Sequence, residues 1–324
     1  MKSKTWSNLL RIALSLALLA WLLQQIGYED VWAVLRQADL RLLGGAWLLF
    51  LLGIVIRTFR WRALLHGLEK YAGLGLRPPF WQLLRLYLVG GFFNAFLPSG
   101  FGGDVVRVLE LAQDTETTAA LGTVFVDRLT GILSLMMLGL LVLPFTRGLQ
   151  PWLIWTLLAL AGGGLFAGFL LLEGRLLRNL TAHLPGGLSL AGQGKLAQVY
   201  AAMTGCGPRA IGEALALSTL FNLLNIVVYW LCGLAVGIPV GLGFYFVVTT
   251  LLSLALLVPI SVGGLGVRDW VAQPLFASVG IAEQVAAGMS LSYYAVTATA
   301  GLVGGILYFG QGLRGLVQTE PPET

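Results

Sequence analysis

Long apolar runs constrain this chain more than any other feature of its sequence. Several run to 18 residues or more, the length that an α-helix needs to cross the hydrocarbon core of a membrane. Only 11% of the 324 residues are charged and 57% are hydrophobic, whereas soluble domains carry about 25% charged residues. We therefore predict an all-α polytopic membrane protein. The expected full spans are Leu9–Ile26, Arg41–Ile56, Ala119–Pro144, Pro151–Leu172, Ile211–Val236 and Val285–Gly312.

One pattern occurs twice: Pro, three residues, Gly-Gly, three residues and Arg. The copies are Pro98–Arg107 (PSGFGGDVVR) and Pro259–Arg268 (PISVGGLGVR). The first follows the apolar region Phe80–Leu97, and the second lies between Gly243–Val258 and Val267–Val279. Helix breakers at corresponding places in two hydrophobic halves are the sequence pointer to a transporter-type binding site at membrane depth.

The loop charges predict the orientation. The loop after the second span is strongly basic, with Arg57, Arg60, Arg62, Lys70 and Arg77. The central loop carries Arg175, Arg178, Lys195 and Arg209. Both loops are therefore expected in the cytoplasm. Three hydrophobic segments separate them, and an odd number of crossings would put them on opposite sides. If Phe80–Leu97 is re-entrant, only two segments cross the membrane, and both basic loops then lie on the same side.

The expected architecture is about six full spans plus two re-entrant or broken helical hairpins in an inverted repeat. Residues 1–324 would form a single integral membrane domain, with halves 1–173 and 210–312 joined by a cytoplasmic loop, 174–209. We expect a multi-pass protein of the plasma (inner) membrane with both termini in the cytoplasm. The alternative is that Phe80–Leu97 crosses fully and that one loop breaks the charge rule.

The repeated motif suggests an anion site. A Gly-rich turn that leads into a helix presents free N–H groups and partial positive charge, which suit a phosphate or carboxylate. Arg107 and Arg268 add guanidinium groups that can bind a phosphate bidentately. Asp104 and Asp269 can orient these arginines or accept a proton or cation. The alternative is that both motifs are tight packing turns whose arginines pair with the nearby acids.

Other polar residues inside apolar runs are also candidates. Asp127 and Arg128 lie within a predicted span, where charge is costly and functional by default, or near its start at the interface. Buried amides can line a cavity or hydrogen-bond across helices; those in question are Asn94, Asn222 and Asn225. Tyr293 and Tyr294 are expected to be interfacial aromatics. Arg85 can face the cavity of the first hairpin or snorkel.

Arg57, Arg60 and Trp61 stand at the predicted cytoplasmic end of the second span. Such clusters commonly anchor a helix to anionic lipid. The sharper interpretation is that these residues form the route by which a lipid headgroup enters from the cytoplasm.

The sequence lacks the motifs of common catalytic sites: it contains no Walker A, HExxH or GxSxG pattern. Two histidines and two cysteines, widely separated, indicate no metal site. We therefore expect no metal, no cofactor, no nucleic-acid partner and no enzymatic activity.

The runs FFNAFLPSGFGGDVVRVLEL, VFVDRLTGIL and VPISVGGLGVRDW, together with RTFRWRALL, resemble a flippase-like integral membrane family related to the transmembrane region of lysylphosphatidylglycerol synthases. The fused members of that family are associated with moving aminoacylated phosphatidylglycerol between leaflets. The resemblance implies functional roles for Asn94, Pro98, Gly102, Gly103, Arg107, Asp127, Arg128, Pro259, Gly263, Gly264, Gly266 and Asp269.

Two departures from the family pattern affect these implications. Asp127 and Asp269 stand where the family commonly has Glu, and an arginine often found near Tyr293 and Tyr294 is missing. The missing arginine puts in doubt whether the headgroup is the same.

The leading hypothesis is a membrane lipid translocase for an anionic or aminoacylated phospholipid or a polyprenyl-linked lipid. One alternative is a secondary transporter of a small anion or amphiphile, coupled to ions through Asp127 or Asp104. Another is a non-catalytic membrane partner of a soluble or membrane-bound lipid-modifying transferase, or a lipid-synthesis enzyme. The sequence does not indicate an oligomeric state.

Overall fold

The fold is all-α. A computed structural model describes residues 28–72, 77–96, 102–113, 116–146, 149–183, 185, 189–257 and 267–317. In this part of the chain every regular element is a helix, which confirms the predicted fold class. The elements are α2 (Tyr28–Arg36), α3 (Leu40–Ala72), α4 (Phe80–Phe96), α5 (Gly102–Leu111), α6 (Thr117–Val142), η1 (Leu143–Phe145), α7 (Pro151–Glu173), α8 (Arg175–Thr181), α9 (Lys195–Thr204), α10 (Gly207–Ala235), α11 (Leu242–Ala255), α12 (Val267–Ala277) and α13 (Glu283–Val317).

Five helices of the described chain are long and apolar enough to cross a membrane: α3, α6, α7, α10 and α13. The predicted spans Pro151–Leu172 and Ile211–Val236 match α7 and α10 closely. The prediction was wrong for α3, which continues to Ala72 instead of ending at Ile56. The predicted span Leu9–Ile26 lies outside the described residues.

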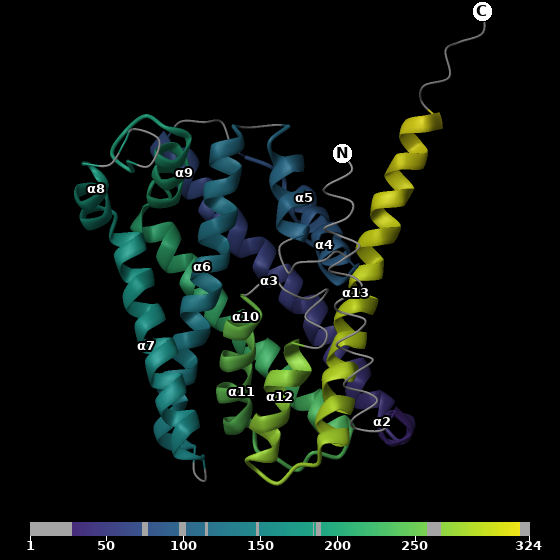
Figure 1. Cartoon of the computed structure of the whole chain (residues 1–324). Coiled ribbons are helices and arrows are strands. Elements are labelled where there is room, and N and C mark those ends of the chain that lie inside the picture. The colour runs from purple at the N-terminus through teal and green to yellow at the C-terminus, as the bar shows by residue number, and fades with distance from the viewer. Residues whose placement is uncertain are drawn as a thin grey trace, which may run out of the picture.

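The long helices alternate in direction. In Figure 1, α3, α7 and α13 run from the lower end of the molecule to the upper end, while α6 and α10 run back. The end of α3 and the start of α10 lie together, because Leu64 and Leu68 share a buried cluster with Cys206. The exposed basic residues Lys70 and Arg77 and the central basic segment therefore lie at the same end, as the parity argument requires, although Arg57, Arg60 and Arg62 belong to α3 and not to a loop.

Two short helical hairpins complete the fold. Figure 1 shows α4 and α5 in the upper half and α11 and α12 in the lower half, and each pair returns to the end from which it started. The helix α4, which covers Phe80–Phe96 of the predicted segment, is thus part of a re-entrant hairpin and does not cross the molecule. The two hairpins approach the middle from opposite ends, which is the arrangement predicted for an inverted repeat.

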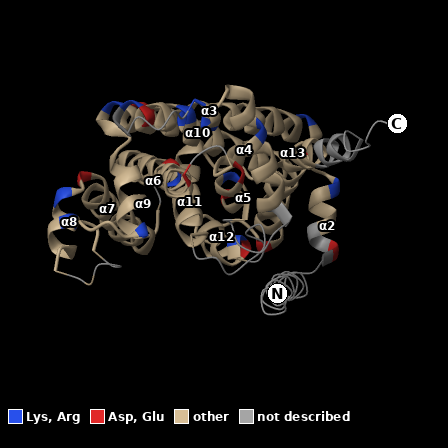
Figure 2. Ribbon diagram, turned by 90° about the horizontal axis from the view of Figure 1, so that it is seen from above, with Lys and Arg blue, Asp and Glu red and all other residues tan. Residues whose placement is uncertain are grey.

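Packing holds the hairpins against the long helices. The largest buried cluster joins α6, α7 and α10 to the second hairpin, for example through Leu135, Ile226, Val248 and Phe276. A second cluster joins α3 to the first hairpin through Trp61, Leu83 and Leu86. Seen from above in Figure 2, charged positions form small groups on a ribbon that is otherwise uncharged where it is described, including groups beside α5, α6 and α12. These inner charges mark the candidate site.

Candidate functional site

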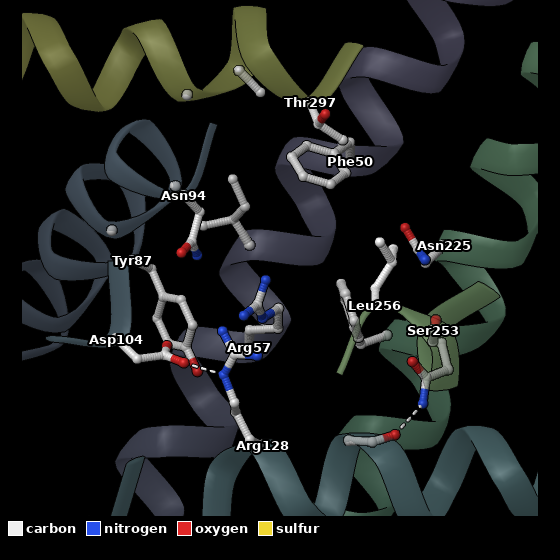
Figure 3. A pocket seen from close by; sticks show the side chains of 18 of the residues that line it. Phe50, Arg57, Tyr87, Asn94, Asp104, Arg128, Asn225, Ser253, Leu256 and Thr297 are labelled. Atoms are coloured by element: carbon white, nitrogen blue, oxygen red, sulfur yellow. Dashed lines mark hydrogen bonds and ion pairs between the residues drawn. The ribbon is translucent and has the colours of Figure 1, made fainter. Parts of the chain in front are cut away.

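A cavity of about 360 Å³ lies where the two hairpins meet the long helices. This central cavity is lined by residues of α3, α4, α5 and α6 and of α10 to α13 (Figure 3). Asn94, just before the first motif, and Asp104, within it, line the cavity, as do Leu257, just before the second motif, and Arg268, its last residue. Both copies of the repeated motif therefore contribute residues to one cavity.

Asp127 is the most buried charge beside the cavity. Its side chain is 0% exposed, and three donors surround it. Arg60 Nε lies 2.7 Å from Oδ1, while Arg107 Nη2 and the Tyr87 hydroxyl lie 3.1 and 2.5 Å from Oδ2. A buried carboxylate is stable only with such partners. This explains why α3 continues past Arg57. The next arginine of the helix, Arg60, is neutralised by Asp127 inside the protein.

Arg107, the arginine of the first motif, is equally buried. It is 1% exposed and donates from Nη1 to Asp104 Oδ1 at 3.1 Å, in addition to its bond to Asp127. Its guanidinium carbon lies 4.1 Å from the ring centre of Trp61 and 3.8 Å from that of Tyr87. Ion pairs and cation–π contacts thus fix this arginine in place.

Arg128 completes a chain of charges across α3, α5 and α6. Its Nε donates to Asp104 Oδ2 (Figure 3), so Asp127 and its neighbour Arg128 have different partners. We call Arg60, Asp127, Arg107, Asp104 and Arg128 the arginine–aspartate network. Within it, three arginines pair with two aspartates.

The first hairpin is closed by a backbone contact. The Gly103 N–H donates to Asn94 Oδ1 at 2.8 Å, so Asn94 satisfies one of the free amides at the start of α5. A Cβ on Gly103 would collide with the Gly90 carbonyl. The Gly-Gly pair is therefore part of the first turn of a helix packed against α4, where the sequence had predicted a Gly-rich turn that leads into a helix.

Arg57 differs from the arginines of the network. It lines the cavity one helical turn before Arg60, with its guanidinium carbon 4.9 Å from the ring centre of Tyr87 and 5.2 Å from that of Phe221. Among the described residues no hydrogen bond or ion pair reaches its side chain, and its Nε is buried without a partner. Figure 3 shows this guanidinium group in the middle of the cavity.

Arg268, the arginine of the second motif, also lines the cavity without an ion pair to any described residue. It is 8% exposed, and its Nε and Nη1 are buried without hydrogen-bond partners in the described chain. Its guanidinium carbon lies 4.7 Å from the ring centre of Tyr293. Tyr293 stacks on Tyr229 and donates its hydroxyl to Asn225 Oδ1 at 3.0 Å.

The structure brings most of the predicted site residues together. Those that line the cavity are Arg57, Arg60, Asn94, Asp104, Arg107, Arg128 and Arg268. Buried close to it are Trp61, Gly102, Gly103, Asp127 and Asp269. The residues that lie outside the described part of the chain are Pro98, Pro259, Gly263, Gly264 and Gly266.

Three placements differ from the expectations. Arg60 and Trp61 are 3% and 0% exposed in the middle of α3, and do not lie at a solvated helix end. Tyr293 is 7% exposed beside the cavity and is not interfacial. Arg85 donates to Glu110 within the first hairpin, 2.8 Å away, and does not line the cavity.

Sequence reasoning missed several lining residues, including Tyr87, Phe221, Ser253 and Thr297. An aromatic or hydroxyl residue in an apolar helix gives no signal of its own, because its role depends on partners from other helices. The sequence did indicate the α10 wall of the cavity through Asn222 and Asn225, two amides on one face of an apolar helix. Both line the cavity.

Comparison with known proteins identifies the family of the chain. No curated protein matches the chain. A family model described as the lysylphosphatidylglycerol synthase TM region matches residues 8–305, which include both hairpins and every residue that lines the central cavity. The chain therefore belongs to the family of lysylphosphatidylglycerol synthase TM regions.

Proposed function

We propose that this protein binds the headgroup of a membrane lipid in the central cavity and moves the lipid between the two leaflets. The observation that carries the proposal is the presence of two guanidinium groups, Arg57 and Arg268, in one cavity without an ion pair to any described residue. The family, which relates to membrane phospholipid metabolism, supports a lipid as the ligand.

The energetics favour an anion at this place. Burying a cation without a counter-ion is costly, and contact with an aromatic ring offsets only part of that cost. A phosphate between the two arginines would accept charge-assisted hydrogen bonds from donors that otherwise lack partners. The lipid tails would remain in the bilayer while the headgroup crosses through the protein.

The position of the two arginines suits alternating access. Arg57 belongs to α3 in the first half of the chain, and Arg268 lies in the first turn of α12 in the second hairpin. In transporters with inverted repeats, one repeat rocks against the other around a site at their interface. Movement between the hairpins would expose the same headgroup site first to one leaflet and then to the other.

Coupling to protons through Asp104 or Asp127 has less support. Every carboxylate oxygen of these residues already accepts a hydrogen bond from an arginine. Releasing a proton carrier would require breaking buried ion pairs. We also propose that the protein is not an enzyme; the described lining residues include no His, Cys or Glu to act as acid, base or nucleophile.

The basic loops support an orientation in which the upper end in Figure 1 faces the cytoplasm. In this orientation the opening of the first hairpin would lie at the cytoplasmic leaflet of the plasma membrane. The family's relation to lipid metabolism also leaves a place for a transferase that supplies the lipid.

Reconstitution tests the proposal. The purified chain is placed in liposomes with lipids labelled on an acyl chain, and the rate at which a quencher outside abolishes fluorescence from the inner leaflet is measured. Arg57→Gln and Arg268→Gln should each slow translocation about tenfold, because a hydrogen bond to a charged group contributes about 1.5–3 kcal/mol and 1.4 kcal/mol corresponds to tenfold.

Arg209→Gln is the matched control. Arg209 pairs with Glu213 on the exposed surface of α10, so this variant should move lipid at the normal rate. Translocation that persists at the normal rate in the Arg57→Gln, Arg268→Gln double variant would contradict the proposed function.

A further inference from the structure

The described walls of the central cavity have no carboxylate to spare for a cation. Asp104 is the sole carboxylate among the described residues that line it. Arg107 and Arg128 donate to its two oxygens. Asp127 behind it is fully buried and saturated by Arg60, Arg107 and Tyr87. An ammonium group that entered the cavity would find five arginines and no free acidic partner on its described walls.

The rings of Tyr87 and Tyr293 beside the cavity are also occupied by arginines. Two guanidinium groups, of Arg57 and Arg107, already lie over the ring of Tyr87. Arg268 lies over Tyr293, whose ring stacks on Tyr229 with centroids 3.8 Å apart. Cation–π contact is the usual way in which a site without carboxylates holds an ammonium group. These rings are therefore already used to hold the protein's own cations.

The amides of Asn94 and Asn225 present donors to the cavity. Asn94 accepts from Gly103 and Asn225 accepts from Tyr293, so the NH₂ of each is left to donate. The neutral acceptors on the described wall include the oxygen of Asn222, whose NH₂ donates to the Gly131 carbonyl at 2.8 Å, and the hydroxyl oxygens of Ser253 and Thr297. The two NH₂ groups suit the oxygens of phosphate, hydroxyl and ester groups, whereas an ammonium group, which is itself only a donor, finds no unpaired charged acceptor on the described walls.

Building on the lipid translocation proposed above, we propose that the central cavity selects a lipid whose headgroup carries an anionic phosphate and is otherwise neutral. It excludes a headgroup that carries a free amine. The phosphate lies between Arg57 and Arg268, and the amides of Asn94 and Asn225 contact its hydroxyl or ester oxygens. Like charges brought together in a low-dielectric site are strongly unfavourable, and this repulsion provides the discrimination.

The experiment compares headgroups at constant acyl chains. The full chain in liposomes is given acyl-labelled phosphatidylglycerol, phosphatidylethanolamine or lysyl-phosphatidylglycerol, and each translocation rate is measured against protein-free liposomes. Phosphatidylglycerol should move at least about tenfold faster than lysyl-phosphatidylglycerol, with phosphatidylethanolamine between them. If no lipid moves faster than in protein-free liposomes, the proposed function fails. If all three move at equal rates, the function stands and the selection is refuted.

A single isosteric change should weaken the selection. Asn225→Asp keeps the oxygen that accepts from Tyr293 and replaces the NH₂ of the cavity wall by a charged oxygen. This variant should translocate lysyl-phosphatidylglycerol faster and phosphatidylglycerol more slowly, reducing the rate ratio several-fold. Gln198→Glu adds the same charge on the exposed face of α9 and should leave the ratio unchanged. If Asn225→Asp leaves the ratio of the two translocation rates unchanged, Asn225 does not contact the headgroup and the proposed selection by this wall is contradicted.

The phosphate group could also belong to a soluble anion. One further measurement distinguishes a soluble anion from a lipid headgroup. Glycerol 3-phosphate at high concentration should leave lipid movement largely unaffected and should not accumulate in the vesicles. If it abolishes lipid movement and is itself taken up, the cavity serves a soluble anion and the lipid selection is overturned.

Discussion

The two hairpins of this protein carry the same motif but use its arginine differently. In the first hairpin Arg107 is 1% exposed and bonded to Asp104 and Asp127. In the second, Arg268 occupies the same motif position, lines the cavity and has no ion pair to a described residue. One copy of the repeat thus has its charge neutralised within the fold, while the other leaves its charge available to a ligand.

The sequence differences between the copies account for this divergence. Asp104 lies three residues before Arg107 within one helical turn, whereas Leu265 lies three residues before Arg268. Asn94 caps the first hairpin four residues before its proline, and Ala255 stands at the corresponding place in the second. The first hairpin has therefore gained polar contacts that fix it to α6. We infer that the first hairpin is the more rigid part of the site.

The largest expected effect comes from removing the charge that neutralises the first hairpin. Asp127→Asn leaves Arg60 and Arg107 buried without their shared carboxylate. Breaking a buried ion pair by removing one partner costs about 3–5 kcal/mol. The free energy of unfolding in mixed detergent micelles should fall by that amount, measured by helix content against denaturing detergent. Glu213→Gln, which breaks the exposed pair with Arg209, should change the free energy of unfolding little. A similar loss of stability in both variants would contradict a specific stabilising role for the buried Asp127 carboxylate.

Substituting the two motif arginines in parallel would break the comparison directly. Arg107→Gln should lower the free energy of unfolding by about 3 kcal/mol, the low end for a buried pair, because Asp127 keeps Arg60 and Asp104 keeps Arg128. Arg268→Gln removes a buried cation that has no ion pair among the described residues, so stability should be unchanged or higher while lipid translocation falls. Equal losses of stability in the two variants would show that the second hairpin is held by its arginine as well.

The spans could be predicted from the sequence because hydrophobic length is a local property. The parity of the basic loops also predicted the re-entrant first hairpin, since it needed only charge counts and an even number of crossings. The end of α3 was missed because it depends on a contact that is distant in the sequence. An arginine such as Arg60 suggests the end of a span, but its neutralising partner Asp127 lies 67 residues away on another helix.

The roles of the individual arginines could not be predicted for the same physical reason. Arg57 and Arg60 are one helical turn apart and look alike in the sequence, yet only Arg60 reaches a carboxylate. The motif made Arg107 and Arg268 look equivalent. Which of them pairs depends on Asp104, on Asp127 and on the ring of Tyr87, which meet only when three helices pack together.

The smallest of these effects concerns how closely the first hairpin can fold on itself. A methyl group on Gly103 would meet the Gly90 carbonyl and, at 2.8 Å, the Asn94 amide nitrogen, so Gly103→Ala should push α5 away from α4. Overpacking of this kind costs about 1–3 kcal/mol, measured as above. Gly91→Ala is the matched control, because its Cβ has nothing within 4 Å and alanine favours the helix. Because Arg107 lies one turn beyond Gly103, the Gly103→Ala variant should also weaken its pairing with Asp127; a stable Gly103→Ala protein with normal translocation would mean that the first hairpin tolerates movement and is not the rigid half of the site.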